Sequence, residues 1–228
     1  KITGRLPSGL SVGGLAAVTD REDAQTFRID GGVRERIQIA PVTGFGVLRL
    51  QQEFAPSAPT VGTSPTGLRR DVEAGTPLGN LLVRDAYAGG VDWTLRFGNG
   101  DYILGGSAGL SHVAGDAAAI ALVQQSSPHY LQRPDQDHVS FGPTRTALTG
   151  YMGGLFFEKN SGRHWLYSAE LFAESPLFEI NDVGRIGTAD DIDAFASLRY
   201  RENQPRGPFQ NYQLAMYGFS GWNFGGIL

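Results

Sequence analysis

Residues 87–97 show the most regular alternation in the chain. Apolar side chains, several of them large aromatics, occupy every second position, and small, polar or charged side chains lie between them. Strands of soluble β-sandwiches usually run about five or six residues, whereas a tilted strand that crosses a bilayer needs about nine to eleven. The length of the alternation therefore predicts a strand with one face in lipid.

The same alternation recurs along the whole chain in a less regular form. It predicts an all-β fold, an antiparallel transmembrane β-barrel segment of about ten strands that is part of a larger barrel. The chain starts at Lys1 inside such a pattern and without a signal peptide, so residues 1–228 are expected to be one partial barrel domain. The predicted strands are 1–5, 10–20, 41–54, 59–70, 84–97, 101–113, 144–158, 164–174, 190–202 and 209–222.

The connections between these strands alternate in length. Short links rich in turn residues alternate with long ones that run over about 21–40, 71–83, 114–143 and 175–189. Bacterial outer-membrane barrels have short periplasmic turns and long extracellular loops. A soluble meander has no reason to sort its loop lengths by side, so the sorting favours an outer-membrane barrel.

Aromatic residues gather near the short links, where an interfacial girdle would lie. The alternative is a soluble β-sandwich or propeller, because aromatics favour strands in general. The residues concerned are Phe54, Trp93, Phe97, Tyr102, Phe156, Phe157, Trp165, Tyr167, Tyr200, Phe209 and Tyr212.

Composition removes several classes of protein. Charged residues make up 18% of the chain, below the roughly 25% of soluble domains. The net charge of −4 gives no sign of a nucleic-acid partner, which would call for a basic patch, so none is predicted. The chain has no cysteine, which excludes disulfides and thiolate metal sites. No apolar run approaches the roughly 20 residues of a membrane-spanning helix.

One helix is expected, over residues 116–125, with Asp116 as its N-cap. It lies inside the longest connection, where it could cap the barrel from outside or fold into its mouth.

Charged residues within the predicted strands must avoid the hydrocarbon, because a lipid-facing charge costs a few kcal/mol at mid-membrane. They are therefore expected to line the lumen, whether that interior is filled or holds water. The lumen-lining candidates are Arg49, Asp92, Thr94, Arg96, Glu170 and Arg199.

The connection at residues 126–144 concentrates His129, Tyr130, Arg133, Asp135 and His138. Histidine and carboxylate side chains can bind zinc or iron, but this spacing matches no metal signature, and no metal or cofactor is predicted. We expect instead that Arg133 pairs with a loop carboxylate and that Tyr130 packs on the barrel rim.

The connection at residues 175–184 offers Glu179, Asn181 and Asp182. Glu179 and Asp182 could act as the carboxylate pair of a glycosidase, and Asn181 with Asp182 suits a calcium site or a structural turn. The structural turn is favoured. No nucleophile elbow, phosphate loop or zinc-protease motif is present, so no catalytic residue is predicted.

Several segments resemble the C-terminal barrel of a family of large bacterial outer-membrane proteins. In that family a carbohydrate-binding-module-like sandwich precedes the barrel, and members are labelled as hydrolases or as domains of unknown function. The resemblance implies an outer-membrane location, contact with lipid and a glycan ligand. It rests on KITGRLPSGLSVGGLAAVT (1–19), AGGVDW (88–93), SPHYLQRPD (127–135), TRTALTGY (144–151) and SPLFEINDVG (175–184).

Three functions remain open at this point. The first is an outer-membrane channel or surface scaffold that handles glycans. The second is a cell-surface hydrolase acting on carbohydrate, and the third is a soluble binding module.

Overall fold

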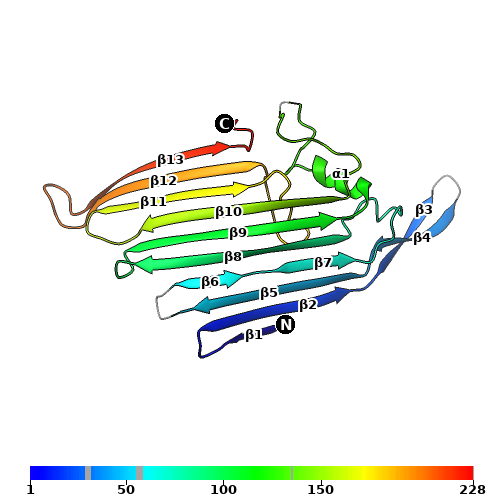
Figure 1. Ribbon diagram of the computed structural model, residues 1–228, viewed down its shortest axis with the longest axis horizontal. Coiled ribbons are helices and arrows are strands. Elements are labelled where there is room, and N and C mark those ends of the chain that lie inside the picture. Colours follow the sequence, from blue (N-terminus) through cyan, green and yellow to red (C-terminus); the bar gives the residue numbers. More distant parts are fainter. Residues whose placement is uncertain (29–31, 55–58, 135, 228) are drawn as a thin grey trace.

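The computed structural model describes residues 1–28, 32–54, 59–134 and 136–227. Eleven strands form one antiparallel sheet in the order β1-β2-β5-β6-β8-β9-β10-β11-β12-β13 (Figure 1). The eleventh strand, β7, lies between β5 and β8 as β6 does, and pairs with both. The elements are β1 (Ile2–Arg5), β2 (Leu10–Thr19), β3 (Glu22–Arg28), β4 (Val33–Ala40), β5 (Thr43–Glu53), β6 (Thr60–Thr63), β7 (Thr66–Arg70), β8 (Asp85–Phe97), β9 (Tyr102–Ala114), α1 (Ala117–Gln125), β10 (Ala147–Lys159), β11 (Trp165–Glu174), β12 (Asp191–Glu202) and β13 (Tyr212–Trp222).

The all-β, antiparallel prediction is confirmed, with two differences. The predicted strand at 59–70 is split into β6 and β7 at Pro65, which has no N–H to donate to the ladder, although its carbonyl accepts from Leu48 N at 3.0 Å. The predicted loop at 21–40 contains the hairpin β3–β4, which forms a separate two-stranded sheet. This hairpin projects beyond the main sheet (Figure 1).

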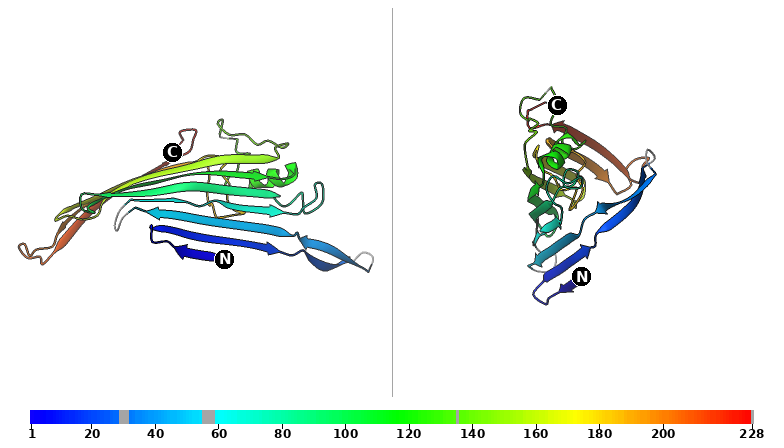
Figure 2. Two further views of the ribbon diagram at one scale, coloured as in Figure 1. Left: turned by 60° about the horizontal axis from the view of Figure 1, so that its bottom comes forward. Right: turned by 90° about the vertical axis from the view of Figure 1, so that its right-hand side faces the viewer.

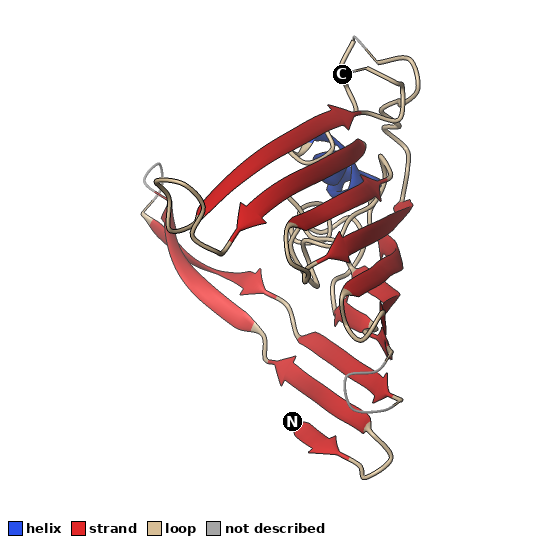
Figure 3. Ribbon diagram, turned by 90° about the vertical axis from the view of Figure 1, so that its left-hand side faces the viewer, coloured by secondary structure: helices blue, strands red, loops and turns tan. Residues whose placement is uncertain are grey.

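The short turns lie at one end of the sheet and the long connections, with α1 and β3–β4, lie at the other (Figure 1). The sheet is curved, and α1 and neighbouring loops lie on its concave side (Figures 2 and 3). No helix in the described part of the chain has the length and apolarity to cross a membrane.

The strand register divides the side chains into a convex and a concave set. Trp93, Leu155 and Leu171 lie in one convex row across β8 to β11, because residues that face each other in an antiparallel sheet share a side. Within the described strands, convex positions carry charge only at strand ends, at Arg69, Asp85, Lys159 and Glu202. Concave positions carry Arg5, Arg49, Glu53, Arg70, Asp92, Arg96, Glu158, Glu170, Glu174, Asp191, Asp193, Arg199 and Arg201.

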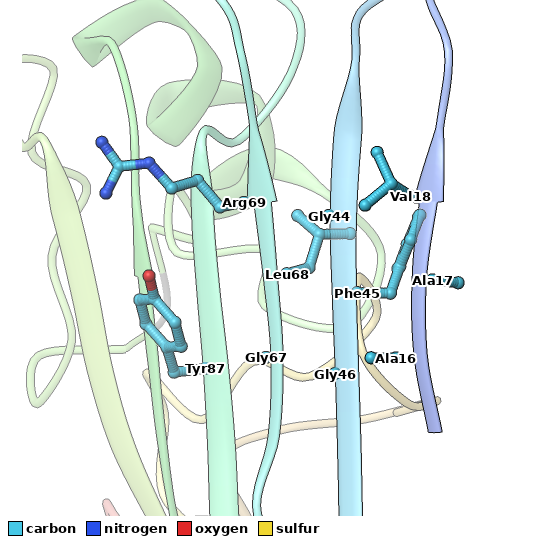
Figure 4. Close-up of a pocket in the computed structure, with 10 residues that line it drawn as sticks. All are labelled: Ala16, Ala17, Val18, Gly44, Phe45, Gly46, Gly67, Leu68, Arg69 and Tyr87. Carbon is cyan, nitrogen blue, oxygen red and sulfur yellow. The ribbon is translucent and has the colours of Figure 1, made fainter. Parts of the chain in front are cut away.

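The convex surface is bulky over β8 to β11 and hollowed over β2, β5 and β7. The small residues Ala16, Gly44, Gly46 and Gly67 line a shallow depression of about 550 Å³ there, beside Tyr87 (Figure 4). Many large apolar side chains on the rest of this face are exposed, among them Leu110 at 65% and Leu155 at 53%.

Aromatic rings contact one another on the convex side at the turn end of the sheet, some stacked and some edge to face. The rings of Phe97 and Tyr102 are 5.4 Å apart, and those of Trp165 and Tyr200 are 5.0 Å apart. Phe156, expected in the same girdle, instead faces the concave side, because it lies directly opposite Gly105 and Glu170.

Candidate functional site

The concave face is covered by protein at its loop end. Leu68, Val113 and Leu148 point inward from β7, β9 and β10 and pack against Ile120 of α1 in one buried cluster. The expected helix is confirmed, and it lies on the concave side of the sheet (Figure 3). Asp116 is its N-cap residue, but its carboxylate accepts from the backbone N of Gly75 at 2.6 Å and does not cap the helix.

The connection at 175–190 rests directly on β10. A Cβ atom at Gly150 would collide with the backbone of Leu177 and Phe178, so only glycine permits this approach. Phe178 then packs with Ile186 and Ala189 in a second buried cluster. The loop is therefore held against the sheet by backbone contact as well as by side chains.

His129 and Glu179 join the two loops in a buried pair. His129 Nε2 lies 2.8 Å from Glu179 Oε2, and the two side chains are 0% and 5% exposed. His129 Nδ1 donates to the carbonyl of Pro176 at 3.0 Å, so one proton must lie between Nε2 and the carboxylate. Glu179 also accepts from Asn181 N, and its own N–H donates to Ser111 Oγ at 2.9 Å. The connection at 126–144, the connection at 175–190 and strand β9 are thus joined at one point.

Asp190 connects the same loops at a second point. Its carboxylate lies 2.8 Å from His138 Nε2 and 3.3 Å from Arg133 Nη2, and it accepts from Phe224 N at 3.0 Å. The expectation that Arg133 pairs with a loop carboxylate is confirmed. Asp190 itself has a φ of 61°, an uncommon backbone conformation for a residue other than glycine.

Asn181 and Asp182 form the structural turn that was favoured. Asn181 Oδ1 accepts from Ile186 N at 3.0 Å, which closes the turn. Asp182 Oδ1 accepts from Arg70 Nη2 at 2.6 Å, and Arg70 also donates to the carbonyl of Val83 at 2.6 Å. Glu179 and Asp182 therefore serve separate partners.

Two further loop candidates remain. Tyr130 is 51% exposed and has a φ of 45°, and the expectation that it packs on a barrel rim stays a prediction. Asp135 lies outside the described residues. His129 and His138 pair with different carboxylates, and among the described residues no group of three or more His, Asp or Glu side chains is placed to hold a metal ion.

Sequence reasoning missed Gln124, Ser111, Ser175 and Asp190. Gln124 is fully buried and bonds both the N–H and the carbonyl of Gly142, at 2.8 and 2.9 Å. Ser175 Oγ accepts from Tyr151 N at 2.8 Å. These residues hold irregular loops, whose contacts have no periodic signal in sequence.

The turn end of the concave face is polar and uncovered. Arg49 reaches across Gly62 to Asp92, with Nη2 2.9 Å from Oδ2, and the Arg49 Cζ would lie 2.6 Å from a Cβ at Gly62. All six lumen-lining candidates lie on this one face: Arg49, Asp92, Thr94, Arg96, Glu170 and Arg199.

Three of those charges have no ion-pair or hydrogen-bond partner among the described residues. They are Arg96, Glu170 and Arg199. An unpaired charge is costly in a dry interior. The turn end is therefore suited to contact with water, whereas the loop end is packed.

Comparison with characterised proteins and with solved structures found no match. A family model described as a domain of unknown function, DUF5916, matches residues 1–223, and the chain belongs to that family.

Proposed function

We propose that the chain forms the wall of a bacterial outer-membrane β-barrel, with its convex face against lipid. The observation that carries this proposal is the distribution of charge. In the eleven-stranded sheet, convex positions are free of charge away from the strand ends, and concave positions of the same sheet carry both signs. A lysine or arginine on the lipid side costs about 2–4 kcal/mol at mid-membrane. A soluble sheet with a free convex face has no such restriction.

The stacked rings at the turn end support an orientation. Phe97, Tyr102 and Phe157 stack together on the convex side, and Lys159 lies 5.5 Å from the Tyr102 ring centre. Aromatic and basic residues of this kind favour the membrane–water interface. The short turns are then periplasmic and the long connections extracellular.

The proposed activity is the handling of a polar solute inside a barrel closed at its extracellular end. The packed loops support closure, because α1 and residues 175–190 are fixed by buried clusters and by the His129–Glu179 pair. The unpaired charges at the turn end support a hydrated interior on the periplasmic side. A permanently open pore is not favoured by this arrangement.

A surface hydrolase that uses Glu179 and Asp182 is less well supported. The Glu179 side chain is 5% exposed and is occupied by His129, while Asp182 is occupied by Arg70. Neither carboxylate is free to attack or protonate a glycosidic bond, as a glycosidase pair must.

Single cysteines test the proposal cleanly, because the chain has none of its own. Ser107 and Ala108 are neighbours on opposite faces of β9, and Ser111 lies under the loops at 2% exposure. In lipid vesicles holding the full-length protein, a charged thiol reagent should label Ser107→Cys, and only a lipophilic reagent should label Ala108→Cys. Ser111→Cys should resist both until the protein is unfolded.

Labelling of Ala108→Cys by the charged reagent as fast as Ser107→Cys would overturn the lipid-facing assignment. Two further measurements apply to the whole protein: its recovery in the outer-membrane fraction, and a shift in gel mobility on boiling. A soluble protein without such a shift would make a soluble sheet the better interpretation.

A further inference from the structure

The uncovered part of the concave face contains a trough that runs across four strands. It has a volume of about 300 Å³, at the lower end of the range of small-molecule sites. Two parallel rows of inward side chains form its walls, and the backbone of the row between them forms its floor. One wall is Asp92, Ser107, Gly154 and Phe172, and the other is Thr94, Gly105, Phe156 and Glu170.

Two aromatic rings in these walls lie against the sheet. The Phe172 ring lies against Gly154, where a Cβ would be 2.7 Å from its Cδ2, and the Phe156 ring lies against Gly105, where a Cβ would collide with its Cε1 and Cζ. Each glycine faces its aromatic directly in the neighbouring strand. Each ring therefore lies close to the sheet and leaves an apolar surface toward the concave side.

Polar groups surround these apolar surfaces. Glu170 lies opposite Phe156 and has no partner among the described residues, while Asp92 is held by Arg49. Thr94 and Ser107 add hydroxyl groups that both donate and accept. The trough therefore combines two aromatic side chains with acceptors and hydroxyls beside them.

This combination matches the chemistry of a pyranose. The axial C–H bonds of a sugar ring form an apolar face, and its hydroxyls point outward in the ring plane. We infer that the trough binds a neutral oligosaccharide, with sugar rings against Phe156 and Phe172 and hydroxyls bonded to Glu170 and Asp92. The inference rests on the proposed function, since the trough is reached from the hydrated interior of the barrel.

The acidic residues around the trough indicate which charge the ligand can carry. Glu174, Asp191 and Asp193 lie on the same concave face next to Phe172, so this part of the lumen is acidic. An oligosaccharide of uronic acids would meet like charge. A neutral chain is therefore expected to bind more tightly than an acidic one.

The test is calorimetric titration of the detergent-solubilised full-length protein with cellohexaose, maltohexaose and hexagalacturonate. At least one neutral hexamer should bind more tightly than the acidic one. Phe156→Leu and Phe172→Leu keep an apolar side chain but remove the flat ring, and each should weaken binding roughly fivefold. Glu170→Gln should weaken it as well.

Phe157→Leu is the matched control, because Phe157 neighbours Phe156 in β10 but faces the convex side. It should leave affinity unchanged, and all variants should keep the gel shift on boiling. Absence of binding by both neutral hexamers, or binding indifferent to Phe156→Leu and Phe172→Leu, would overturn the saccharide site. If the cysteine-labelling pattern holds in that case, the barrel proposal survives, whereas loss of that pattern would defeat the proposed function itself.

Discussion

The two ends of the concave face are made by the same strands but differ in what they contact. Strand β8 presents Ala86 to the packed cluster at its loop end and Asp92 and Arg96 at its turn end. Strand β10 changes in the same way, from Leu148 to Glu158. The convex side of these strands carries charge only at its ends, at Asp85 of β8 and Lys159 of β10. A strand can therefore keep one environment on one face and change environment halfway along the other.

The difference between the two ends comes from the loops. At the loop end, α1 and residues 175–190 exclude water, so inward residues must be apolar or fully paired. At the turn end the described chain places nothing over the sheet, and charges without protein partners are tolerated. Substitutions should therefore be costly at the loop end and nearly neutral at the turn end.

The largest effect is expected from His129→Ala. Removing the imidazole leaves the Glu179 carboxylate buried without its partner, which costs about 3–5 kcal/mol. Guanidinium unfolding of the protein in detergent, followed by tryptophan fluorescence, measures this loss. The double variant His129→Leu/Glu179→Met replaces both polar groups with apolar ones and should recover most of it. A single variant as stable as the double would show that the pair does not hold the loops.

A smaller effect is expected from Gly150→Ala. The added methyl group meets loop backbone at Leu177 and Phe178, which must move, at a cost of about 1–3 kcal/mol. Gly153→Ala is the matched control on the same strand, because its nearest neighbour would be 3.8 Å away. Limited proteolysis should cut residues 175–190 faster only in Gly150→Ala. Equal proteolysis of the two variants would argue against a tightly seated loop.

Much of the sheet was predictable because each strand obeys a local rule. Alternation located the strands, and the cost of charge in lipid placed Arg49, Glu170 and Arg199 on one face before any contact was known. The β3–β4 hairpin was missed although β4 alternates Ile37 and Ile39 with Arg36 and Gln38, because β3, with Glu22, Asp23 and Gln25, shows little apolar alternation and the hairpin stands apart from the main sheet.

The loop network was only partly predictable. Both loops were recognised as unusual, but His129 and Glu179 are 50 residues apart, and no spacing rule shows that they pair. Asp190 and Gln124 carried no signal at all, because their roles depend on backbone positions in irregular segments. Long-range contacts between loops are set by tertiary packing and not by local pattern.

At the turn end, Arg49→Ala should cost about 0.5–1 kcal/mol. Arg49 and Asp92 are more than one third exposed, so solvent screens their attraction, although Arg49 also bonds Ser64 and Gln51. Asp92→Asn should give a similar loss, and the double variant should lose little more, because both single changes break the same contact. Additive losses in guanidinium unfolding would contradict a shared ion pair.

The smallest effect is expected from Arg199→Ala, which should change the free energy of unfolding by no more than about 0.5 kcal/mol. Arg199 lies on the concave face of β12 and has no partner among the described residues, so its loss leaves no buried charge behind. This variant tests whether the turn end of the concave face is open to water. A loss above about 2 kcal/mol would mean that Arg199 is desolvated and paired in the folded protein. The turn end would then be as enclosed as the loop end, and a hydrated interior with a solute-binding trough would no longer be tenable.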